Sequence, residues 1–290
     1  MALGWAIPLA LASGATWAIG MTVAKPALRQ TDHLTYLLGR WIVVAALAAG
    51  YAAIRGDLFF PGWNAFGWAI GAGLVDAVAG GLLYQLALER TETHQTTTLA
   101  STVPLWGVVS AVLFLGESSR WTVIIAAILV VAGAYFLIGR GRLRLRSALV
   151  GSALALLTAI LWGVAETVPS KLALDAGMTP PLQLLVFSLS AVAGTALLMP
   201  FLRTKIPLRI SPRGLLLTAI SGAGGAFLGW VLWLSSLQIA PASVISPVRG
   251  STILFAFVYS VLFLKERPMP AAFLGGALVL VGVVLVSVGG

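Results

Sequence analysis

The 290-residue sequence predicts an all-α polytopic membrane protein, with ten transmembrane helices arranged as two inverted five-helix repeats. Two observations predict this fold. The composition is 59% hydrophobic and 9% charged, and the mean hydropathy of +1.01 indicates a chain that is solvated mostly by lipid. The second half of the chain also repeats the pattern of the first half, which indicates that one structural unit occurs twice.

Apolar runs follow one another with short polar gaps, and each is long enough to cross a hydrocarbon core about 30 Å thick, which needs roughly 20 residues. The predicted spans of the first half are 4–23, 34–54, 66–88, 95–115 and 121–138, and those of the second half are 149–170, 181–201, 214–237, 242–264 and 271–288. Five is an odd number, so the second half must enter the membrane from the opposite side. We therefore expect repeats over 1–140 and 149–290, joined by a basic linker over 141–148.

The repeat is clearest near the ends of the fourth and ninth spans. At a shift of 149 residues, Val-Leu-Phe-Leu-Gly-Glu over 112–117 corresponds to Val-Leu-Phe-Leu-Lys-Glu over 261–266. The first spans of the two halves correspond at a shift of 145, which aligns Trp17 with Trp162. Loop length explains the difference of four residues, so both halves are expected to fold in the same way.

Basic residues predict the orientation in the membrane. The loops after odd-numbered spans, counted with Arg40 at the start of the second span, hold fourteen lysines and arginines, whereas the loops after even-numbered spans hold three. Since basic loops stay in the cytoplasm, we expect the linker there and both termini outside, in the inner membrane of the cell. The same asymmetry accounts for the net charge of +9, so the sequence predicts a lipid bilayer around the protein and no nucleic-acid partner.

The sequence has no enzyme signature. Cysteine is absent, and the two histidines, His33 and His94, lie near span ends and cannot form a metal site by themselves. Neither a nucleophile elbow nor a phosphate-binding glycine loop occurs. We therefore expect no catalytic residue, no metal and no cofactor, and any transport must be passive or driven by an ion gradient.

Glycines and prolines predict how the spans pack. The pairs Gly67/Gly71 and Gly225/Gly229 have the GxxxG spacing that allows close contact between membrane helices. Pro104 and Pro247 lie within the fourth and ninth spans, where proline removes a backbone hydrogen bond, and they predict a kink in each. The two prolines are not at equivalent positions of the repeat, so the two kinks need not be equivalent.

These features together resemble the ten-helix EamA-type family of the drug/metabolite transporter superfamily. Both repeats carry a polar segment leading into the fourth or ninth span, a proline in that span, a closing Leu-Phe-Leu followed by glutamate, and a glycine in the last span, over Thr91–Gly133 and Ile239–Gly282. The resemblance covers essentially the whole chain. It implies a carrier whose spans one, three, four, six, eight and nine surround a cavity that opens alternately to each side, and it does not indicate the substrate.

Apart from Arg40, which is counted with the loops, three charged residues lie within the predicted spans, where an unpaired charge is costly. They are Asp76 in the third span, Glu166 in the sixth and Arg249 in the ninth. None has an ionisable counterpart in the other repeat, where the equivalent residues are Gly225, Met21 and Ala100. This asymmetry favours a role toward a substrate, although Glu166 and Arg249 can instead form a structural ion pair, and Asp76 a protonated core carboxyl group.

Aromatic side chains form the second group of candidates. Trp17 and Trp162 are equivalent in the two repeats and lie among small residues, which leave room beside a ring. Rings beside a carboxylate suit a cation or an aromatic substrate, although helix packing is the alternative for each ring. The aromatic candidates for the substrate site are Trp17, Tyr84, Trp106, Trp162, Trp230 and Trp233. Five tryptophans near span ends, Trp5, Trp41, Trp63, Trp68 and Trp121, are expected in the interfacial belt.

We therefore expect a secondary-active transporter of small metabolites. The first hypothesis is an exporter of amino acids or related amphipathic compounds, in which Glu166 holds the amine and Arg249 the carboxylate; export rests on the resemblance alone. The second is a carrier of organic cations through an aromatic cage with Asp76 or Glu166. The third is a channel or a membrane scaffold without turnover. Asp76 and Glu166 are also the candidates for proton coupling, and the sequence indicates no oligomeric state.

Overall fold

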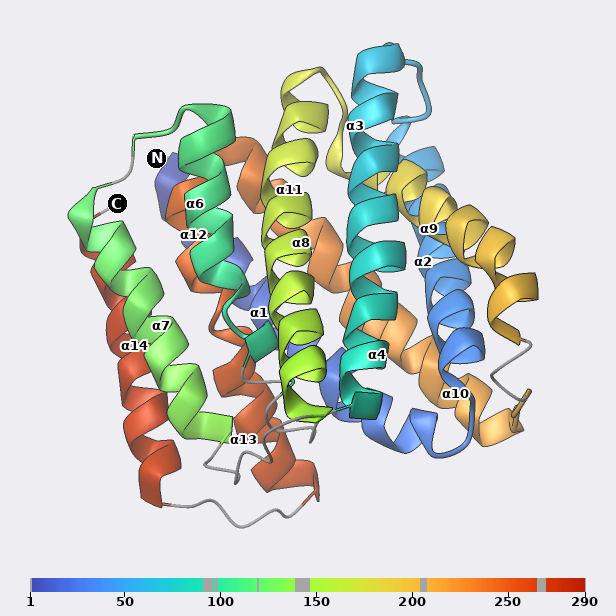
Figure 1. Ribbon diagram of the computed structural model, residues 1–290. Coiled ribbons are helices and arrows are strands. Elements are labelled where there is room, and N and C mark those ends of the chain that lie inside the picture. Colours follow the sequence, from blue (N-terminus) through green and yellow to red (C-terminus); the bar gives the residue numbers. More distant parts are fainter. Residues whose placement is uncertain are drawn as a thin grey trace.

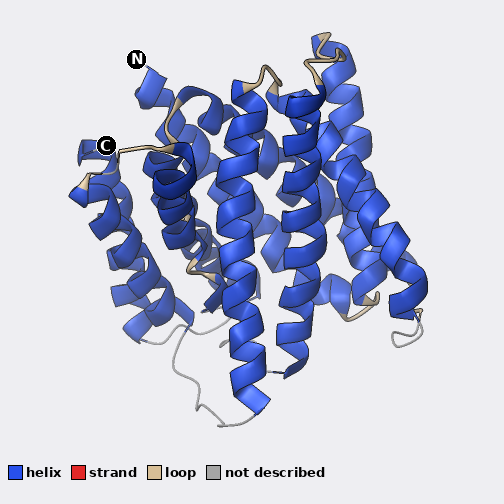
Figure 2. Ribbon diagram, turned by 45° about the horizontal axis from the view of Figure 1, so that its top comes forward, coloured by secondary structure: helices blue, strands red, loops and turns tan. Residues whose placement is uncertain are grey.

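The computed structural model of the chain describes residues 2–90, 96, 99–118, 120–138, 147–203, 208–264 and 270–289. Throughout these residues the regular elements are helices, and Figure 2 shows no strand among them. In the same part of the chain, seven helices are long and apolar enough to cross a membrane, and shorter apolar helices lie over 103–115, 121–136 and 273–285. The all-α, multi-span fold is thus observed, while the count of ten spans stays a prediction.

The helices of the two halves follow one another in corresponding order, except that the counterpart of α12, at 93–100, lies mostly outside the described residues. The first half contains α1 (Ala2–Leu28), α2 (His33–Arg55), α3 (Trp63–Gly73), η1 (Leu74–Gly80), α4 (Gly81–Arg90), α6 (Val103–Leu115) and α7 (Trp121–Ile138). The second contains α8 (Ser147–Asp175), α9 (Pro180–Arg203), α10 (Pro212–Ile220), η2 (Ser221–Phe227), α11 (Leu228–Ile239), α12 (Ala242–Arg249), α13 (Thr252–Leu264) and α14 (Pro270–Gly289). The last helices of the two halves, α7 and α14, lie side by side and run in opposite directions (Figure 1), as inverted repeats require.

The third predicted span of each repeat contains a π-helical segment. In the first repeat, α3 and α4 continue through η1, and in the second repeat α10 and α11 continue through η2. A π-helical turn places one extra residue in the turn and often marks a functional site. The apolar pattern predicts the span but not this change of helical period, because all of its residues are small or apolar except Asp76 and Ser221.

The fourth and ninth spans are interrupted at equivalent positions. In the first repeat a turn over 101–102 precedes α6, and in the second repeat 250–251 separate α12 from α13, which is the same position at the shift of 149 residues. Pro104 is therefore not inside a continuous helix but at the start of α6, where its missing N–H costs no hydrogen bond. Where the sequence predicts a kink in a continuous helix, the structure has an interruption between two helices. The two interruptions lie at equivalent positions of the repeats, although Pro104 and Pro247 do not.

Glycines allow close contact between helices of different repeats, but not at every predicted position. Gly225 of η2 meets the backbone of Gly20 in α1, where an added Cβ on Gly225 would lie 2.5 Å from the Gly20 Cα. By contrast, no atom lies within 4 Å of a Cβ added to Gly67 or Gly71. The prediction of close packing at Gly67/Gly71 is therefore wrong, because this face of α3 points away from its neighbours.

A buried carboxylate joins the two repeats at one end of the molecule. Asp32 caps α2 by accepting from the Thr35 N–H at 2.9 Å, and its Oδ1 lies 2.8 Å from Nη1 of Arg203. Its Oδ2 accepts from the backbone N–H of Arg209 at 2.9 Å. Burial by itself would raise the pKa of Asp32, but the hydrogen bonds from Arg209, Thr35 and Arg203 outweigh it and lower this pKa to about 2. The turn between α1 and α2 is thereby tied to the ends of α9 and α10.

The glutamate that closes the Leu-Phe-Leu-x-Glu motif of the first repeat caps a helix of the second repeat. Glu117 Oε1 accepts from the Ala242 N–H at 2.9 Å, and Oε2 accepts from the Ser243 N–H at 2.7 Å. A carboxylate at a helix N-terminus is stabilised by the free N–H groups and by the helix dipole. Glu266, its equivalent in the second repeat, lies outside the described residues.

Candidate functional site

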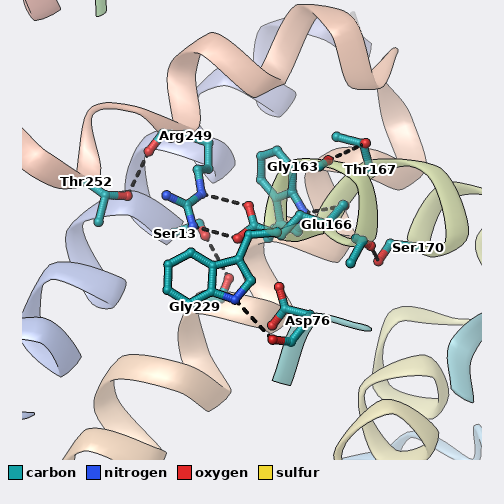
Figure 3. Close-up of polar contacts among 12 residues, drawn as sticks. Ser13, Asp76, Gly163, Glu166, Thr167, Ser170, Gly229, Arg249 and Thr252 are labelled. Carbon is teal, nitrogen blue, oxygen red and sulfur yellow. Dashed lines mark hydrogen bonds and ion pairs between the residues drawn. The ribbon is translucent and has the colours of Figure 1, made fainter. Parts of the chain in front are cut away.

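The centre of the site is a buried ion pair between α8 and α12. Arg249 Nε donates to Glu166 Oε2 at 2.7 Å, and Arg249 Nη2 donates to Glu166 Oε1 at 2.6 Å, so both carboxylate oxygens are engaged (Figure 3). Bidentate pairs of this kind are the strongest that arginine forms. The sequence left open whether Glu166 and Arg249 contact a substrate or pair with each other. In the conformation described, they pair with each other.

Aromatic side chains enclose the pair on both sides. The guanidinium carbon of Arg249 lies 4.9 Å from the ring centre of Trp17, a cation-π contact. The indole Nε1 of Trp233 donates to the backbone carbonyl of Glu166 at 2.9 Å. Trp17 in turn packs against Trp233 and Trp230, with ring centres 5.9 Å and 5.8 Å apart. Five predicted site residues on α1, α8, α11 and α12 thus form one connected group.

Asp76 lies beside this group on η1. The Nε1 of Trp162 donates to the backbone carbonyl of Asp76 at 3.0 Å, and the Asp76 carboxyl group is turned toward the ion pair (Figure 3). Its side chain is buried, and Oδ2 has no hydrogen-bond partner. Tyr84 packs against Trp162 with ring centres 5.3 Å apart. The three ionisable candidates, Asp76, Glu166 and Arg249, thus lie near one another in the structure.

The two equivalent tryptophans occupy equivalent places. The indole of Trp162 lies against Gly80, where an added Cβ would lie 2.5 Å from Nε1, and the indole of Trp17 lies against Gly229 in the same way. Gly80 and Gly229 are themselves equivalent at the shift of 149 residues. In each case the tryptophan belongs to one repeat and the glycine to the other, so a side chain at either glycine would displace the ring.

A small gap lies between the first repeat and the second beside the ion pair. It has no room for a water molecule and is lined by Val103, Pro104, Gly107, Gly163, Glu166, Thr167, Trp233, Ser246 and Arg249. Ligand pockets are typically about 300–1,000 Å³. The conformation described is therefore closed around the pair, and a substrate of metabolite size requires the helices to separate.

Trp106, the remaining aromatic candidate, lies at the edge of this group. It is held by a hydrogen bond from its Nε1 to Thr102 Oγ1 at 3.1 Å, and it does not line the gap. The hydroxyl groups of Thr16, Ser235 and Ser246 each donate to a carbonyl of their own helix, as hydroxyl groups in membrane helices commonly do. Among the described residues, no group of three or more histidine and acidic side chains is placed to hold a metal ion.

One tryptophan is placed differently from its prediction. Trp41 was expected in the interfacial belt but is buried, with 3% of its surface exposed. Its ring lies 5.2 Å from that of Phe187, which lies 4.4 Å from that of Trp230. Phe187 had no sequence signal, because a phenylalanine in an apolar span is equally suited to face lipid. Together with Trp17 these rings form a continuous aromatic row from Arg40, which lies over Trp41 at 5.4 Å, to Arg249.

Comparisons with known proteins agree with this architecture. The model of the EamA-like transporter family matches the chain twice, over residues 4–139 and 149–288. A crystal structure of another protein, 18% identical in sequence, has a TM-score of 0.84 over 97% of this chain and 97% of that chain, which shows a shared fold. No curated protein matches the sequence. The two family matches cover both repeats, and the chain is therefore a multi-pass membrane protein that belongs to the EamA-like transporter family.

Proposed function

We propose that the protein is a secondary-active transporter of small metabolites that works by alternating access between its two inverted repeats. The observation that carries this proposal is the buried Glu166–Arg249 pair, which lies beside a closed gap where α6 of one repeat meets α8, α11 and α12 of the other. Buried charges without counterparts in the repeat are costly to keep for packing alone. The basic linker lies in the cytoplasm and both termini lie outside, in the inner membrane.

The substrate class we propose first is an amino acid or a related amphipathic compound that is exported. When the helices separate, Glu166 binds the amine and Arg249 the carboxylate, because the two groups of the substrate replace the two charges that pair in the closed state. Trp17 and Trp233, which contact this pair, then bind the remainder of the molecule. In this proposal the Glu166–Arg249 ion pair holds the site closed without substrate, and it separates when a zwitterion binds to both residues.

A specific observation favours a second candidate, a carrier of organic cations. Both oxygens of Glu166 accept hydrogen bonds from Arg249, whereas the Asp76 carboxyl group has an enclosed oxygen without a partner. Trp162 donates to the backbone carbonyl of Asp76, and Tyr84 packs against Trp162, so two aromatic rings belong to the surroundings of this residue. An ammonium group bound between a carboxylate and aromatic rings gains both charge pairing and cation-π attraction. In this case the Glu166–Arg249 pair is structural.

Counterflow in proteoliposomes separates the two candidates. Radiolabelled amino acids and tetraethylammonium are tested in parallel with the wild type, with Asp76→Asn, and with the double variant Glu166→Gln/Arg249→Gln. The double variant is used because removing one partner of a buried pair leaves the other charged, at a cost of about 3–5 kcal/mol. The matched control is Arg55→Gln, since the Arg55 side chain is 63% exposed at the end of α2.

The amino-acid proposal predicts saturable counterflow of amino acids in the wild type and in Arg55→Gln, and a loss of at least about tenfold in the double variant. Cation counterflow that survives in the double variant but is lost in Asp76→Asn supports the second candidate and overturns the first. Absence of saturable counterflow for every compound, in protein that is folded and monodisperse, contradicts transport and supports a scaffold.

A further inference from the structure

Asp76 is a membrane-buried acid whose carboxyl group has no bound partner among the described residues. Its side chain is 7% exposed, and the enclosed Oδ2 accepts no hydrogen bond. Trp162 donates to the backbone carbonyl of this residue and does not engage its carboxyl group. Asp76 also lies in the π-helical segment η1, and such segments occur frequently at functional sites. At this depth an ionised carboxylate without a cation is costly, so the neutral form fits the conformation described.

Arg40 is a half-buried arginine with an unpartnered polar atom of its own. It is the eighth residue of α2, close to the start of the span, as the sequence predicts. Its Nε is enclosed by protein and has no hydrogen-bond partner. The ring of the adjacent Trp41 is 5.4 Å from its guanidinium carbon, which compensates part of the charge but satisfies no N–H group.

Arg40 and Asp76 lie at nearly the same depth. The residue Leu37 of α2 meets Gly81 of α4, where an added Cβ would lie 3.4 Å from Leu37 Cδ1. From this contact, Arg40 is three residues forward along α2, and Asp76 is five residues back along the antiparallel third span (Figure 1). At about 1.5 Å per residue both steps run in the same direction, by roughly 4.5 Å and 7.5 Å. The two residues therefore differ by only about 3 Å along the helix axes.

Arg40 is the one cation near Asp76, among the described residues, that is not already paired with a carboxylate. The charged groups that act on Asp76 are Glu166 from α8, Arg249 from α12 and Arg40 from α2. Of the elements packed against η1, α3 has no ionisable residue and α9 has none before Arg203. Helix α4 has Tyr84 and, in its last turn, Glu89 and Arg90. Besides Glu166, α8 has Lys171 and Asp175, which face each other near its end. The guanidinium group of Arg249 already donates to both carboxylate oxygens of Glu166. Within the described residues, Arg40 is therefore the cation available to an ionised Asp76.

We propose that Asp76 carries the coupling proton of transport and that Arg40 is the positioning residue that receives the Asp76 carboxylate when this proton leaves. The inference rests on the proposed transport function. In the conformation described, the proton is on Asp76 and Arg40 is apart from it. Release of the proton to one side of the membrane leaves a carboxylate that draws Arg40 and α2 toward the third span, and a proton from the other side separates them again. Because α2 packs against α9 and η2 of the other repeat, this movement changes the contact between the repeats.

The test measures protonation of Asp76 without a substrate. Purified protein in proteoliposomes is treated with N,N′-dicyclohexylcarbodiimide, an apolar reagent that reacts with protonated carboxyl groups, over a range of pH, and the labelled residue is identified by mass spectrometry. We expect labelling at Asp76 that falls as pH rises and is absent in Asp76→Asn. In Arg40→Gln and Arg40→Met, the midpoint should move up by about one pH unit or more, a roughly tenfold tighter binding of the proton.

The conservative variant and a matched control complete the test. Arg40→Lys keeps the charge, so its midpoint should stay closer to the wild type than that of either neutral variant. Arg55→Gln removes an arginine from the exposed end of the same helix and should not move the midpoint. Labelling of Asp76 that does not depend on pH overturns its role as the proton site, and an unchanged midpoint in both neutral variants overturns the role of Arg40. Failure of the transport proposal would be recognised separately, as absent counterflow with the labelling profile intact.

Discussion

The ion network around Asp32 gives the most direct prediction for stability. Asp32→Asn keeps the size of the side chain and removes the charge that faces Arg203. The pKa of Asp32 is lowered from its ordinary value of 3.8 to about 2. At 1.36 kcal/mol per pH unit, this corresponds to about 2 kcal/mol of stabilisation of the folded protein by the ionised group. Because the Asp32 side chain is only 6% exposed, solvent screening does not reduce this value much.

The direction of the Asp32 pKa shift determines the pH range in which the ionised group stabilises the protein. A carboxyl group whose pKa is lower in the folded protein than in the unfolded chain stabilises the fold above the unfolded pKa. For Asp32 that contribution is complete above about pH 4 and is lost as pH falls toward 2. The free energy of unfolding is measured in lipid nanodiscs from tryptophan fluorescence, for the wild type and for Asp32→Asn. The difference between them should be about 2 kcal/mol at pH 6 and should decline toward zero near pH 2.

The control for this experiment is another acid with a basic neighbour. Asp175 lies 3.3 Å from Lys171 at the exposed end of α8, with 56% of its side chain exposed. Since exposed pairs contribute little, Asp175→Asn should change the free energy of unfolding by less than about 0.5 kcal/mol. The reasoning is refuted if Asp32→Asn and Asp175→Asn have equal effects at pH 6, or if the effect of Asp32→Asn does not depend on pH.

Two further predictions concern contacts between the repeats. Glu117→Ala removes the carboxylate that accepts from the first two backbone N–H groups of α12. It should lower the melting temperature by several degrees, corresponding to about 1–2 kcal/mol. Glu117→Asp keeps the charge and should lower the melting temperature less, so an equal decrease in both variants would contradict the capping role. Gly229→Ala places a methyl group into the indole of Trp17 and should destabilise the protein by about 1–3 kcal/mol, whereas Gly67→Ala, which meets no atom within 4 Å, should be neutral or stabilising by up to about 1 kcal/mol. Thermal unfolding of the purified variants measures all of these effects, and a destabilised Gly67→Ala would show that its surroundings are not open.

The sequence was most informative where one residue type had one physical meaning. Three ionisable residues within apolar spans marked the site, because a charge in hydrocarbon must have a partner or a function. Glycine was less informative, since the same GxxxG spacing is packed at Gly225/Gly229 and open at Gly67/Gly71. Whether a glycine meets a neighbour depends on the rotation of its helix, and an apolar sequence on all sides does not fix that rotation.

Positions near predicted span ends were the main source of error. Trp41 is expected in the interfacial belt, but its side chain is buried, and the adjacent Arg40 is enclosed at Nε. Both lie near the start of α2, as predicted. Hydropathy cannot distinguish a tryptophan there that faces a neighbouring helix from one of an interfacial belt. The partners of Asp32 were missed for a related reason, since they lie about 170 residues away in the chain.

The sequence by itself determined the class of the protein. Hydrocarbon cannot satisfy backbone hydrogen bonds, so a chain of this composition must form helices across the membrane, and the repeated motifs require each half to fold alike. Only the tertiary structure decided that Glu166 and Arg249 bind each other, and that Asp76 and Arg40 each keep an unpartnered polar atom. It also decided that the fourth and ninth spans are interrupted at equivalent positions of the repeat. Hydropathy is a property of each helix alone, whereas the partner of a side chain depends on how neighbouring helices are rotated and shifted against one another.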